Sequence, residues 1–583
     1  MTPAIACVCA FATYFCAYRF YSKFLAQKLY ELRAHTKTPA FVYHDGVDYV
    51  PTKVPVLFGH HYASITGLAP MLGPAIAVIW GWVPAMLWVV LGSILIGCVH
   101  DFSALVLSIR ARGLSVGTIA EDILGRRAKW LFLMIIFFGV GLAMGVFVFV
   151  LAKLFGLYLV PPDPTSGQMG QRGYPEAVPP SVLLMVIAAL VGIILKKTKC
   201  SFVPVMSCAF LFSIAGIWLG LALKGMGIYE DYWLSFQQWI WVLLGYAFMA
   251  SVLPVWTLLQ PRDFLNALLL YLGLFLTFLG LFVSNPDFDA PAFVLEPDGA
   301  PPMFPFVFIL IACGAASGFH GLVSSGTTSK QISVELDARP VGYGGMIGES
   351  LLGLLAVLAC TAGFGSSTAW HHHYASFHSA KGLPQKLAGF IDGSTTFLTG
   401  LGLPEELCSA VIAMIVVSFA LTTLDSATRL LRFNIEELFG KFSPFQNRYV
   451  SASAAVGTIA FFAFFEVGGK PAALALWGLF GTTNQLLAGL TLILATLYLR
   501  ARRKPVIYTG IPAVFMMAST LVSMVINLRG FIAHSDGSIV LTLMGGVLLL
   551  LAIWLTVEAV LIVVKKPLSE GWEIDVRSQH LEP

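Results

Sequence analysis

The chain has 583 residues, of which 57% are hydrophobic and 11% are charged. Soluble domains carry about 25% charged residues, so this composition excludes a soluble globular protein and indicates a membrane protein. The formal net charge of +4 is too small to indicate nucleic-acid binding. Nine cysteines without a CxxC pair indicate small packing residues and neither a disulfide framework nor a metal site.

Apolar stretches that are long enough to cross a bilayer recur along the whole chain. A spanning helix needs about 20 apolar residues, and about fifteen stretches approach or exceed that length. They predict an all-α polytopic membrane protein. The first stretch lacks a preceding basic segment, which predicts a retained span and not a cleaved signal. The stretches are 3–21, 57–79, 82–109, 130–159, 180–195, 202–223, 238–259, 264–284, 304–323, 341–363, 405–427, 450–467, 471–499, 506–528 and 538–564.

Basic residues gather in alternate connections between these spans, and this alternation predicts the orientation of the chain. The connections near 160–179 and 285–303 are acidic and contain one arginine between them. We therefore expect the N-terminus outside and the C-terminus in the cytoplasm. The basic connections contain Arg19, Lys23, Lys28, Arg33, Lys37, Arg110, Arg112, Arg126, Arg127, Lys129, Lys196, Lys197, Lys199, Arg262, Lys330, Arg339, Arg429, Arg432, Lys441, Arg448, Arg500, Arg502, Arg503 and Lys504.

The segment 57–77 is apolar but rich in residues that interrupt a helix. Each glycine or proline weakens a helix, and every freed backbone group needs a partner where there is no water. We expect a broken helix that is buried against other helices and lines a substrate or ion site, as in secondary transporters. The residues concerned are Gly59, His60, His61, Ser64, Thr66, Gly67, Pro70, Gly73 and Pro74.

The ninth span ends in a second segment of small and hydroxyl residues, 313–330, which carries His320. By the predicted orientation, its hydroxyls reach the same depth as those of the first segment. Oxygen ligands suit a dehydrated Na⁺, whereas histidines can carry a proton near neutral pH. The alternative is that these small residues only allow the helices to pack closely and form no ion or proton site. The hydroxyl residues are Ser324, Ser325, Thr327 and Thr328.

Ionisable groups inside spans are costly, by about 2.5 kcal/mol or more, so each is a candidate for function. His100 and Asp101 are adjacent in the third span, and we expect them to point in two directions. Asp101 is either a proton-carrying or structural carboxylate, or a capped group near the cytoplasmic interface. Glu349 is either a proton site or an interhelical bond, and Asp425 closes the eleventh span.

Other polar groups lie at the end of the seventh span and within the thirteenth. Trp256 and Gln260 precede the pair Arg262–Asp263, which is either a gate or an interfacial anchor. The amides of Asn484 and Gln485 would be costly in lipid, so we expect them to face protein.

The connection 364–404 is predicted to lie outside and to contain a re-entrant or surface-lying segment at 387–403, which is too short and too rich in glycine to span. Its histidines are either a transition-metal site or part of an exposed polar loop without function, and the loop is favoured. They are His371, His372, His373 and His378. No GxGxxG after a strand, Walker A sequence or HExxH occurs, so we expect no enzyme activity, no cofactor and no ATP-driven transport.

The chain resembles the carbon starvation protein A family at landmarks that keep their order from about residue 50 to residue 504. These landmarks are Leu57–Pro74, Cys98-Val-His-Asp-Phe, Ile311-Ala-Cys-Gly-Ala-Ala-Ser-Gly-Phe-His, Ser324-Ser-Gly-Thr-Thr, Gly342-Tyr-Gly-Gly-Met, Thr422-Thr-Leu-Asp-Ser-Ala-Thr-Arg and Leu479-Phe-Gly-Thr-Thr-Asn-Gln-Leu-Leu-Ala-Gly.

The resemblance implies a bacterial inner-membrane nutrient carrier of the amino acid–polyamine–organocation group, with a LeuT-like core of two five-helix inverted repeats. It implies an N-terminal peripheral helix and cytoplasmic loop in 1–56, a ten-helix transport core in 57–427 and C-terminal peripheral helices in 428–583. Members of the family are associated with peptide use during carbon starvation and with pyruvate uptake coupled to protons.

We therefore expect a secondary active symporter for a small organic nutrient, most simply pyruvate or a related carboxylate, driven by H⁺ or Na⁺. A peptide transporter is the first alternative, and a nutrient-sensing or metal-dependent membrane protein is the second. The expected partners are the nutrient, the coupling ion and the lipid bilayer, without nucleic acid. The expected substrate-binding residues are Gly59, His60, His61, Ser64, Thr66, Gly67, Trp256, Gln260 and His320, and the expected ion-coupling residues are His100, Asp101, Ser324, Ser325, Thr327, Thr328, Glu349 and Asp425.

Overall fold

The computed structural model of the protein consists almost entirely of helices in its described part. It describes residues 1–156, 158–160, 170–198, 200–231, 233–380, 382–439, 442–467, 470–471, 477–533 and 539–565. Here α denotes an α-helix, η a short π- or 3₁₀-helix and β a strand.

The first half of the chain contains α1 (Pro3–Cys16), η1 (Ala17–Tyr21), α2 (Ser22–Phe24), η2 (Leu25–Leu29), α3 (Pro39–Val42), α4 (Val54–Ile65), α5 (Ala69–Ala77), η3 (Val78–Trp80), α6 (Trp82–Leu87), η4 (Trp88–Gly97), α7 (Cys98–Arg110), α8 (Val116–Leu124), α9 (Arg126–Phe155), β1 (Tyr158–Val160), β2 (Gly170–Arg172), η5 (Pro175–Ala177), α10 (Val178–Lys197), α11 (Phe202–Gly225), α12 (Ile228–Asp231), α13 (Phe236–Val252) and α14 (Leu259–Ser284).

The second half contains α15 (Met303–Leu310), α16 (Ala312–Ala315), α17 (Gly318–Gly326), η6 (Thr328–Lys330), η7 (Glu335–Asp337), η8 (Arg339–Tyr343), α18 (Gly344–Ala362), α19 (Ser367–His373), α20 (Phe377–Ala380), α21 (Leu383–Thr399), α22 (Glu405–Phe439), η9 (Ser443–Gln446), α23 (Arg448–Phe464), β3 (Glu466–Val467), β4 (Lys470–Pro471), α25 (Trp477–Ala501), α26 (Ile507–Ala533) and α27 (Ile539–Lys565). Strands β1 and β2 form one antiparallel pair, and β3 and β4 form another.

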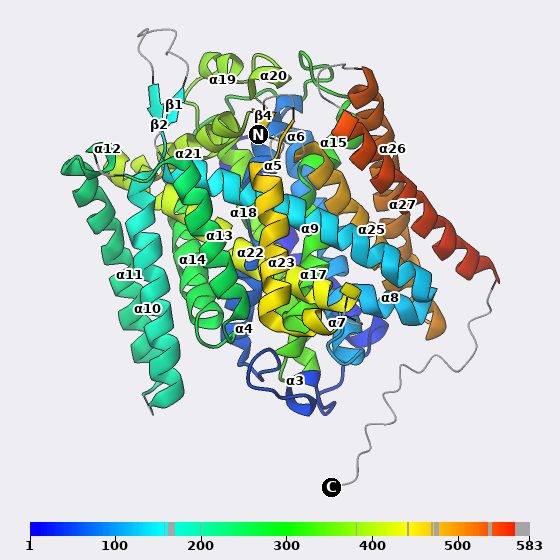
Figure 1. Ribbon diagram of the computed structural model, residues 1–583. Coiled ribbons are helices and arrows are strands. Elements are labelled where there is room, and N and C mark those ends of the chain that lie inside the picture. Colours follow the sequence, from blue (N-terminus) through cyan, green and yellow to red (C-terminus); the bar gives the residue numbers. More distant parts are fainter. Residues whose placement is uncertain are drawn as a thin grey trace.

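The helices form a bundle whose long members run between two ends (Figure 1). Helices α10 and α11 form one edge of the bundle, and α26 and α27 form the opposite edge. Helix α9 crosses obliquely through the middle and packs against the 35-residue helix α22. Helices α19 and α20 lie at one end and α3 lies at the other.

Within the described residues, eleven helices are long and apolar enough to cross a membrane, or up to twelve when the bent pair α4–α5 counts as one span. The chain is therefore a multi-pass membrane protein. The expected number of fifteen is not confirmed, because three of the apolar stretches form shorter or interrupted helices. Helices α13 and α23 have 17 residues each, and the ninth stretch is divided into α15, α16 and α17.

The helix expected to break in 57–77 does break. Helices α4 and α5, with η3 after α5, meet at a bend of 47°. Thr66 at the end of α4 adopts an extended backbone conformation, with φ −78° and ψ 92°, so its successors cannot continue the helix. Pro70 lies in the first turn of α5, where its missing N–H costs no helical hydrogen bond. Every residue from Gly59 to Trp80 is buried.

A second break separates α16 from α17. Ala316 and Ser317 are both extended, with ψ of 97° and 125°. The freed N–H of Phe319 donates a hydrogen bond of 2.8 Å to Oδ1 of the buried Asn484. The amide of Asn484 thus faces protein, as expected, and satisfies backbone at the break. Helix α16 packs against α5, and α17 packs against α4, so the two broken segments lie side by side.

Two glycines permit this close contact. A Cβ at Gly73 of α5 would lie 2.2 Å from the carbonyl oxygen of Leu310, and a Cβ at Gly97 of η4 would lie 2.1 Å from that of Ala315. Because both obstacles are backbone atoms, a larger residue requires the helices to separate. These two contacts place the second broken segment between α5 and η4.

We expect Gly73→Ala to destabilise the protein by about 1–3 kcal/mol, the usual cost of inserting a methyl group into a packed interior. The matched control is Gly245→Ala on α13, where a Cβ meets no atom within 4 Å. Removal of a mid-helix glycine there raises stability by about 0.5–1 kcal/mol. Thermal unfolding of the two variants in detergent tests the expectation, and equal melting temperatures would contradict it.

Elements outside the broken segments are also tied to the bundle. The hydroxyl of Tyr14 on α1 lies 2.5 Å from Ser350 Oγ on α18. Helix α21, within the connection 364–404, packs against α5, α14, α18 and α22. Whether α21 is re-entrant, and whether 1–56, 57–427 and 428–583 are separate units, stay predictions.

Candidate transport site

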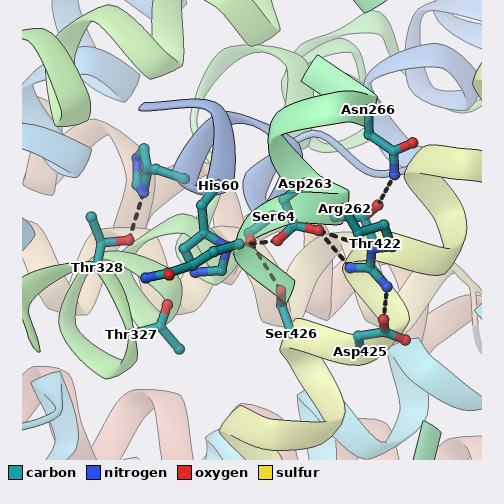
Figure 2. A network of polar contacts seen from close by, with 12 residues as sticks. His60, Ser64, Arg262, Asp263, Asn266, Thr327, Thr328, Thr422, Asp425 and Ser426 are labelled. Carbon is teal, nitrogen blue, oxygen red and sulfur yellow. Dashed lines mark hydrogen bonds and ion pairs between the residues drawn. The ribbon is translucent and has the colours of Figure 1, made fainter. Parts of the chain in front are cut away.

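The adjacent histidines of α4 are fully buried and face different partners. His60 Nδ1 lies 2.6 Å from Asp263 Oδ2 on α14, and His61 Nδ1 lies 2.9 Å from Thr328 Oγ1 on η6. Figure 2 shows His60 directed at Asp263. The break after Ile65 therefore stands next to two separate groups of polar side chains.

The first group, the Arg262 cluster, consists of His60, Arg262, Asp263 and Asp425, which are labelled in Figure 2, together with Tyr246. Arg262 donates from Nη2 to Asp263 Oδ1 at 2.6 Å and from Nη1 to the hydroxyl of Tyr246 at 2.5 Å, and it also forms an ion pair with Asp425. The Tyr246 hydroxyl donates to Asp425 Oδ2 at 2.5 Å. One guanidinium thus compensates two buried carboxylates from α14 and α22.

The second group, the His320 cluster, consists of His100, Asp101, His320 and Glu349. Nδ1 of His320 lies 2.9 Å from Asp101 Oδ2, and its Nε2 lies 2.8 Å from Glu349 Oε2. His100 Nδ1 lies 2.7 Å from Asp101 Oδ1. All four residues have 0% exposure. A single imidazole therefore bridges two carboxylates from α7 and α18, which is an arrangement able to accept and pass a proton.

This geometry corrects the expectation that His100 and Asp101 point in two directions. Their side chains turn toward each other and make direct contact. The Nδ1 atom of a histidine and the carboxylate of an aspartate lie close to their own backbone, so rotation about the side-chain bonds brings neighbours on a helix together.

The hydroxyl residues do not converge on one point. Ser325 Oγ donates to the carbonyl of Gly321 at 2.7 Å, and Thr327 Oγ1 donates to that of Val323 at 3.1 Å, both within their own helix. Ser64 Oγ lies 2.9 Å from Ser426 Oγ on α22 (Figure 2). Within the described residues, the hydroxyls of Thr66 and Ser324 are buried without a hydrogen-bond partner.

The two glycines expected in the site make contacts between helices. A Cβ at Gly59 would lie 3.2 Å from the Cα of Phe264, and a Cβ at Gly67 would lie 2.8 Å from Thr423 Oγ1. Gly59 thus lets α4 approach α14, and Gly67 lets the break approach α22.

Trp256 and Gln260 do not join either cluster. Gln260 Nε2 donates to Thr52 Oγ1 at 2.9 Å and to Gln331 Oε1 at 2.7 Å. Trp256 Nε1 donates to the carbonyl of Gly46 at 3.2 Å. Both side chains bind residues of 43–53, the segment that leads into α4. They form no hydrogen bond with His60, His61 or His320, with which they were expected to form the substrate site.

The segment 43–53 also carries a charged contact that the sequence did not indicate. Asp48 Oδ1 lies 2.8 Å from Arg429 Nη1, and Asp48 Oδ2 lies 3.6 Å from Arg432 Nη2. Burial alone would raise the pKa of the Asp48 carboxyl, but the two guanidinium groups of α22 outweigh burial and lower this pKa. Asp48 is therefore ionised at neutral pH and fastens this segment to α22.

Sequence reasoning also missed Tyr246, which links Arg262 to Asp425, and no spacing signal pointed to it. The pair Arg262–Asp263 was recognised but not connected to His60, which is 203 positions from Asp263. Among the described residues, no group of three or more His, Cys, Asp or Glu side chains is placed to hold a metal ion, and this includes the histidines of α19 and α20.

Comparison with known proteins identifies the chain's relatives. The protein named pyruvate/proton symporter BtsT of Escherichia coli (strain K12) is 32% identical over 595 residues, covering 88% of this chain and 80% of that protein. The protein named peptide transporter CstA of Campylobacter jejuni is 33% identical over 572 residues, covering 88% and 78%.

Among solved structures, the Eremococcus coleocola manganese transporter in complex with an aromatic bis-isothiourea substituted compound aligns with a TM-score of 0.47 at 10% identity, covering 89% of this chain and 98% of its own. A similarity of that size assigns neither a ligand nor a mechanism. The sequence model described as "Carbon starvation protein CstA" matches residues 3–371 and 366–523, which is most of the chain. The chain therefore belongs to the carbon starvation protein CstA family, whose relatives named above are transporters.

Proposed function

We propose that this chain is a secondary active symporter that takes up a small carboxylate, with pyruvate as the first choice, together with a proton. The observation that carries the proposal is the position of His320 between Asp101 and Glu349, at 2.9 and 2.8 Å. A histidine changes charge near neutral pH, and its two carboxylate partners come from helices on either side. The name of the Escherichia coli relative supports the same choice of substrate and ion.

The hydrogen bonds of the hydroxyl groups in 324–328 favour a proton over Na⁺ as the coupling ion. A dehydrated Na⁺ needs several oxygen atoms directed at one point. The hydroxyls of Ser325 and Thr327 donate to carbonyls of their own helix, and that of Thr328 contacts His61. This arrangement supports helix packing more than cation binding, so Na⁺ is the second choice of coupling ion.

The substrate carboxylate is proposed to bind at the half-helix N-termini beside the two breaks. The backbone N–H groups at the starts of α5 and α17 carry partial positive charge, which favours an anion. His60 and His61 lie in α4, beside the first break, where they can add charge-assisted hydrogen bonds. Both ring nitrogens of His320 face carboxylates, so His320 is assigned to the proton and not to the substrate. Gly59, Ser64, Thr66 and Gly67 complete this proposed site.

The membrane placement is also part of the proposal. We place the chain in the bacterial inner membrane with its N-terminus outside, its C-terminus in the cytoplasm and its transport core in 57–427, arranged as a LeuT-like inverted repeat. The positive-inside pattern supports this orientation.

Uptake by proteoliposomes tests the proposal. With the interior alkaline, we expect pyruvate to accumulate above its external concentration, and a protonophore to abolish the accumulation. Replacing sodium by potassium on both sides should leave the rate unchanged, because protons drive the cycle. Absence of gradient-dependent accumulation of pyruvate and of short peptides would overturn the transport proposal.

A peptide transporter is the second candidate, because the Campylobacter jejuni relative carries that name. The same vesicles distinguish the two substrates. Accumulation of di- or tripeptides without accumulation of pyruvate would replace the first choice by the second. If pyruvate at a saturating concentration slows peptide uptake, the two substrates share one binding site.

A further inference from the structure

A cavity of about 250 Å³ lies apart from both buried clusters, between α10, α11, the first turns of α14 and the segment that leads into α4. Its walls are mainly apolar, and two lysines, a threonine and a glutamine add polar side chains. The residues that carry the argument are Lys53, Lys196, Phe202, Met206, Trp256 and Gln260.

The two lysines of this cavity have no acidic partner among the residues that the structure describes. Lys53 and Lys196 lie within 4 Å of no carboxylate in the part of the chain that the structure describes. Among the described residues that line the cavity, none is acidic. The ammonium group of Lys196 lies 4.9 Å from the centre of the Trp256 ring, an attraction that holds the charge over the cavity without neutralising it. The cavity therefore has an uncompensated positive charge.

The cavity lies where several membrane helices end. Helix α10 ends at Lys197, α11 begins at Phe202, and α4 begins at Val54. Lysines at helix ends and an indole ring are typical of the boundary between hydrocarbon and headgroups. At Gly192, α10 comes so close to the turn after α13 that a Cβ would lie 2.4 Å from the carbonyl oxygen of Thr257, so the cavity is bounded by firmly packed backbone.

We propose that this cavity binds the headgroup of an anionic phospholipid. Its phosphate would lie between the ammonium groups of Lys53 and Lys196, and the first part of its acyl chains would lie against Phe202 and Met206. A basic pocket between membrane helices is suited to such lipids. A zwitterionic headgroup fits less well, because its own ammonium group would face two lysines with no carboxylate to receive it.

The bound lipid would brace the segment that precedes α4. Gln260, which lines the cavity, donates hydrogen bonds to Thr52 Oγ1 and to Gln331 Oε1. Thr52 in turn donates its backbone N–H to the carbonyl of Gln331 at 3.0 Å. Lys53 follows Thr52 in the chain, so a headgroup bound to Lys53 contacts the segment that connects α4 with the residues after η6. Binding of the lipid should therefore raise the melting temperature of the protein.

Lipid retention on the full chain tests the proposal independently of transport. The protein is purified in detergent, incubated with phosphatidylglycerol or with phosphatidylethanolamine of the same acyl composition, and examined by native mass spectrometry. We expect phosphatidylglycerol to be retained and to raise the melting temperature. The double variant Lys53→Gln/Lys196→Gln should bind it about 30-fold more weakly, from the usual attraction per lysine at an anionic surface.

The matched control is Lys197→Gln, an exposed lysine at the same helix end that does not line the cavity. This variant should bind phosphatidylglycerol as the unaltered protein does. If the double variant fails to fold, each single variant should still show about a 5-fold loss. Equal binding of the two lipids, an unchanged affinity in the double variant, or displacement of the lipid by millimolar inorganic phosphate would overturn the proposal. Loss of transport with normal lipid retention would concern the symporter proposal alone.

Discussion

Replacing Glu349 with glutamine is expected to abolish accumulation of substrate driven by a proton gradient. Glutamine keeps the size of the side chain but cannot exchange a proton with His320, which lies 2.8 Å from the carboxylate. A glutamine amide does not take up a proton near neutral pH, so gradient-driven uptake should fall to the level that remains in the presence of a protonophore. Initial rates in proteoliposomes with the interior alkaline measure the effect.

Exchange of labelled for unlabelled substrate at equal pH separates coupling from binding. If Glu349 belongs to the proton path, Glu349→Gln should still exchange substrate while failing to accumulate it. The matched control is Glu558→Gln in α27, where Trp554 of the same helix is the one hydrogen-bond donor to the carboxylate among the described residues. Accumulation by Glu349→Gln at the unaltered rate would remove the His320 cluster from the coupling mechanism.

Replacing Arg262 with alanine is expected to lower the stability of the protein strongly. Arg262 is the guanidinium that compensates both Asp263 and Asp425. Its loss removes the guanidinium from two buried carboxylates and leaves Asp263 with His60 and Asp425 with Tyr246, at a cost of about 3–5 kcal/mol. Thermal unfolding in detergent, followed by the loss of monodisperse protein, measures this effect.

Two further variants make the result specific to charge. Arg262→Ala/Asp425→Asn should recover part of the lost stability, because one of the uncompensated charges is then absent. Arg127→Ala, an exposed arginine near the start of α9, should change stability by less than about 0.5 kcal/mol. The charge-compensation account fails if the double variant is no more stable than Arg262→Ala.

The broken helix of α4 and α5 could be predicted because its cause is local. Gly67 follows Thr66 directly and Pro70 lies four positions after it, and their effect on backbone conformation does not depend on the rest of the fold. The second segment was recognised by the same kind of signal, since Gly314, Ser317 and Gly318 surround its break. Local composition therefore located the two segments that lie together in the bundle.

The partners of the buried charges could not be predicted, because they depend on tertiary packing. His60 meets Asp263 on a helix 203 positions away, and His320 meets Asp101 at a separation of 219. A single sequence gives each costly ionisable group but not the neighbour that compensates it. Tyr246 was even harder to predict, because nothing in the sequence distinguishes it from other tyrosines in apolar spans.

The expected fifteen spans are not confirmed among the described helices, and the difference has a physical reason. Hydropathy measures the apolar character of a stretch but not the continuity of its helix. The stretch at 304–323 is mainly apolar, yet its helix is interrupted at Ala316 and Ser317. In the stretch at 238–259, the helix ends at Val252. An apolar stretch can therefore be as long as a lipid-facing span and still form only a short or interrupted helix.

The two histidines of α4 make this half-helix a mechanical link. Consecutive residues of an α-helix project about 100° apart, so the contact of His60 with Asp263 and that of His61 with Thr328 fix its rotation from two sides. Thr328 follows α17, the half-helix that bears His320. A rotation of α4 that lengthens one of these contacts therefore also changes the other, so this half-helix connects the position of α14 to that of η6.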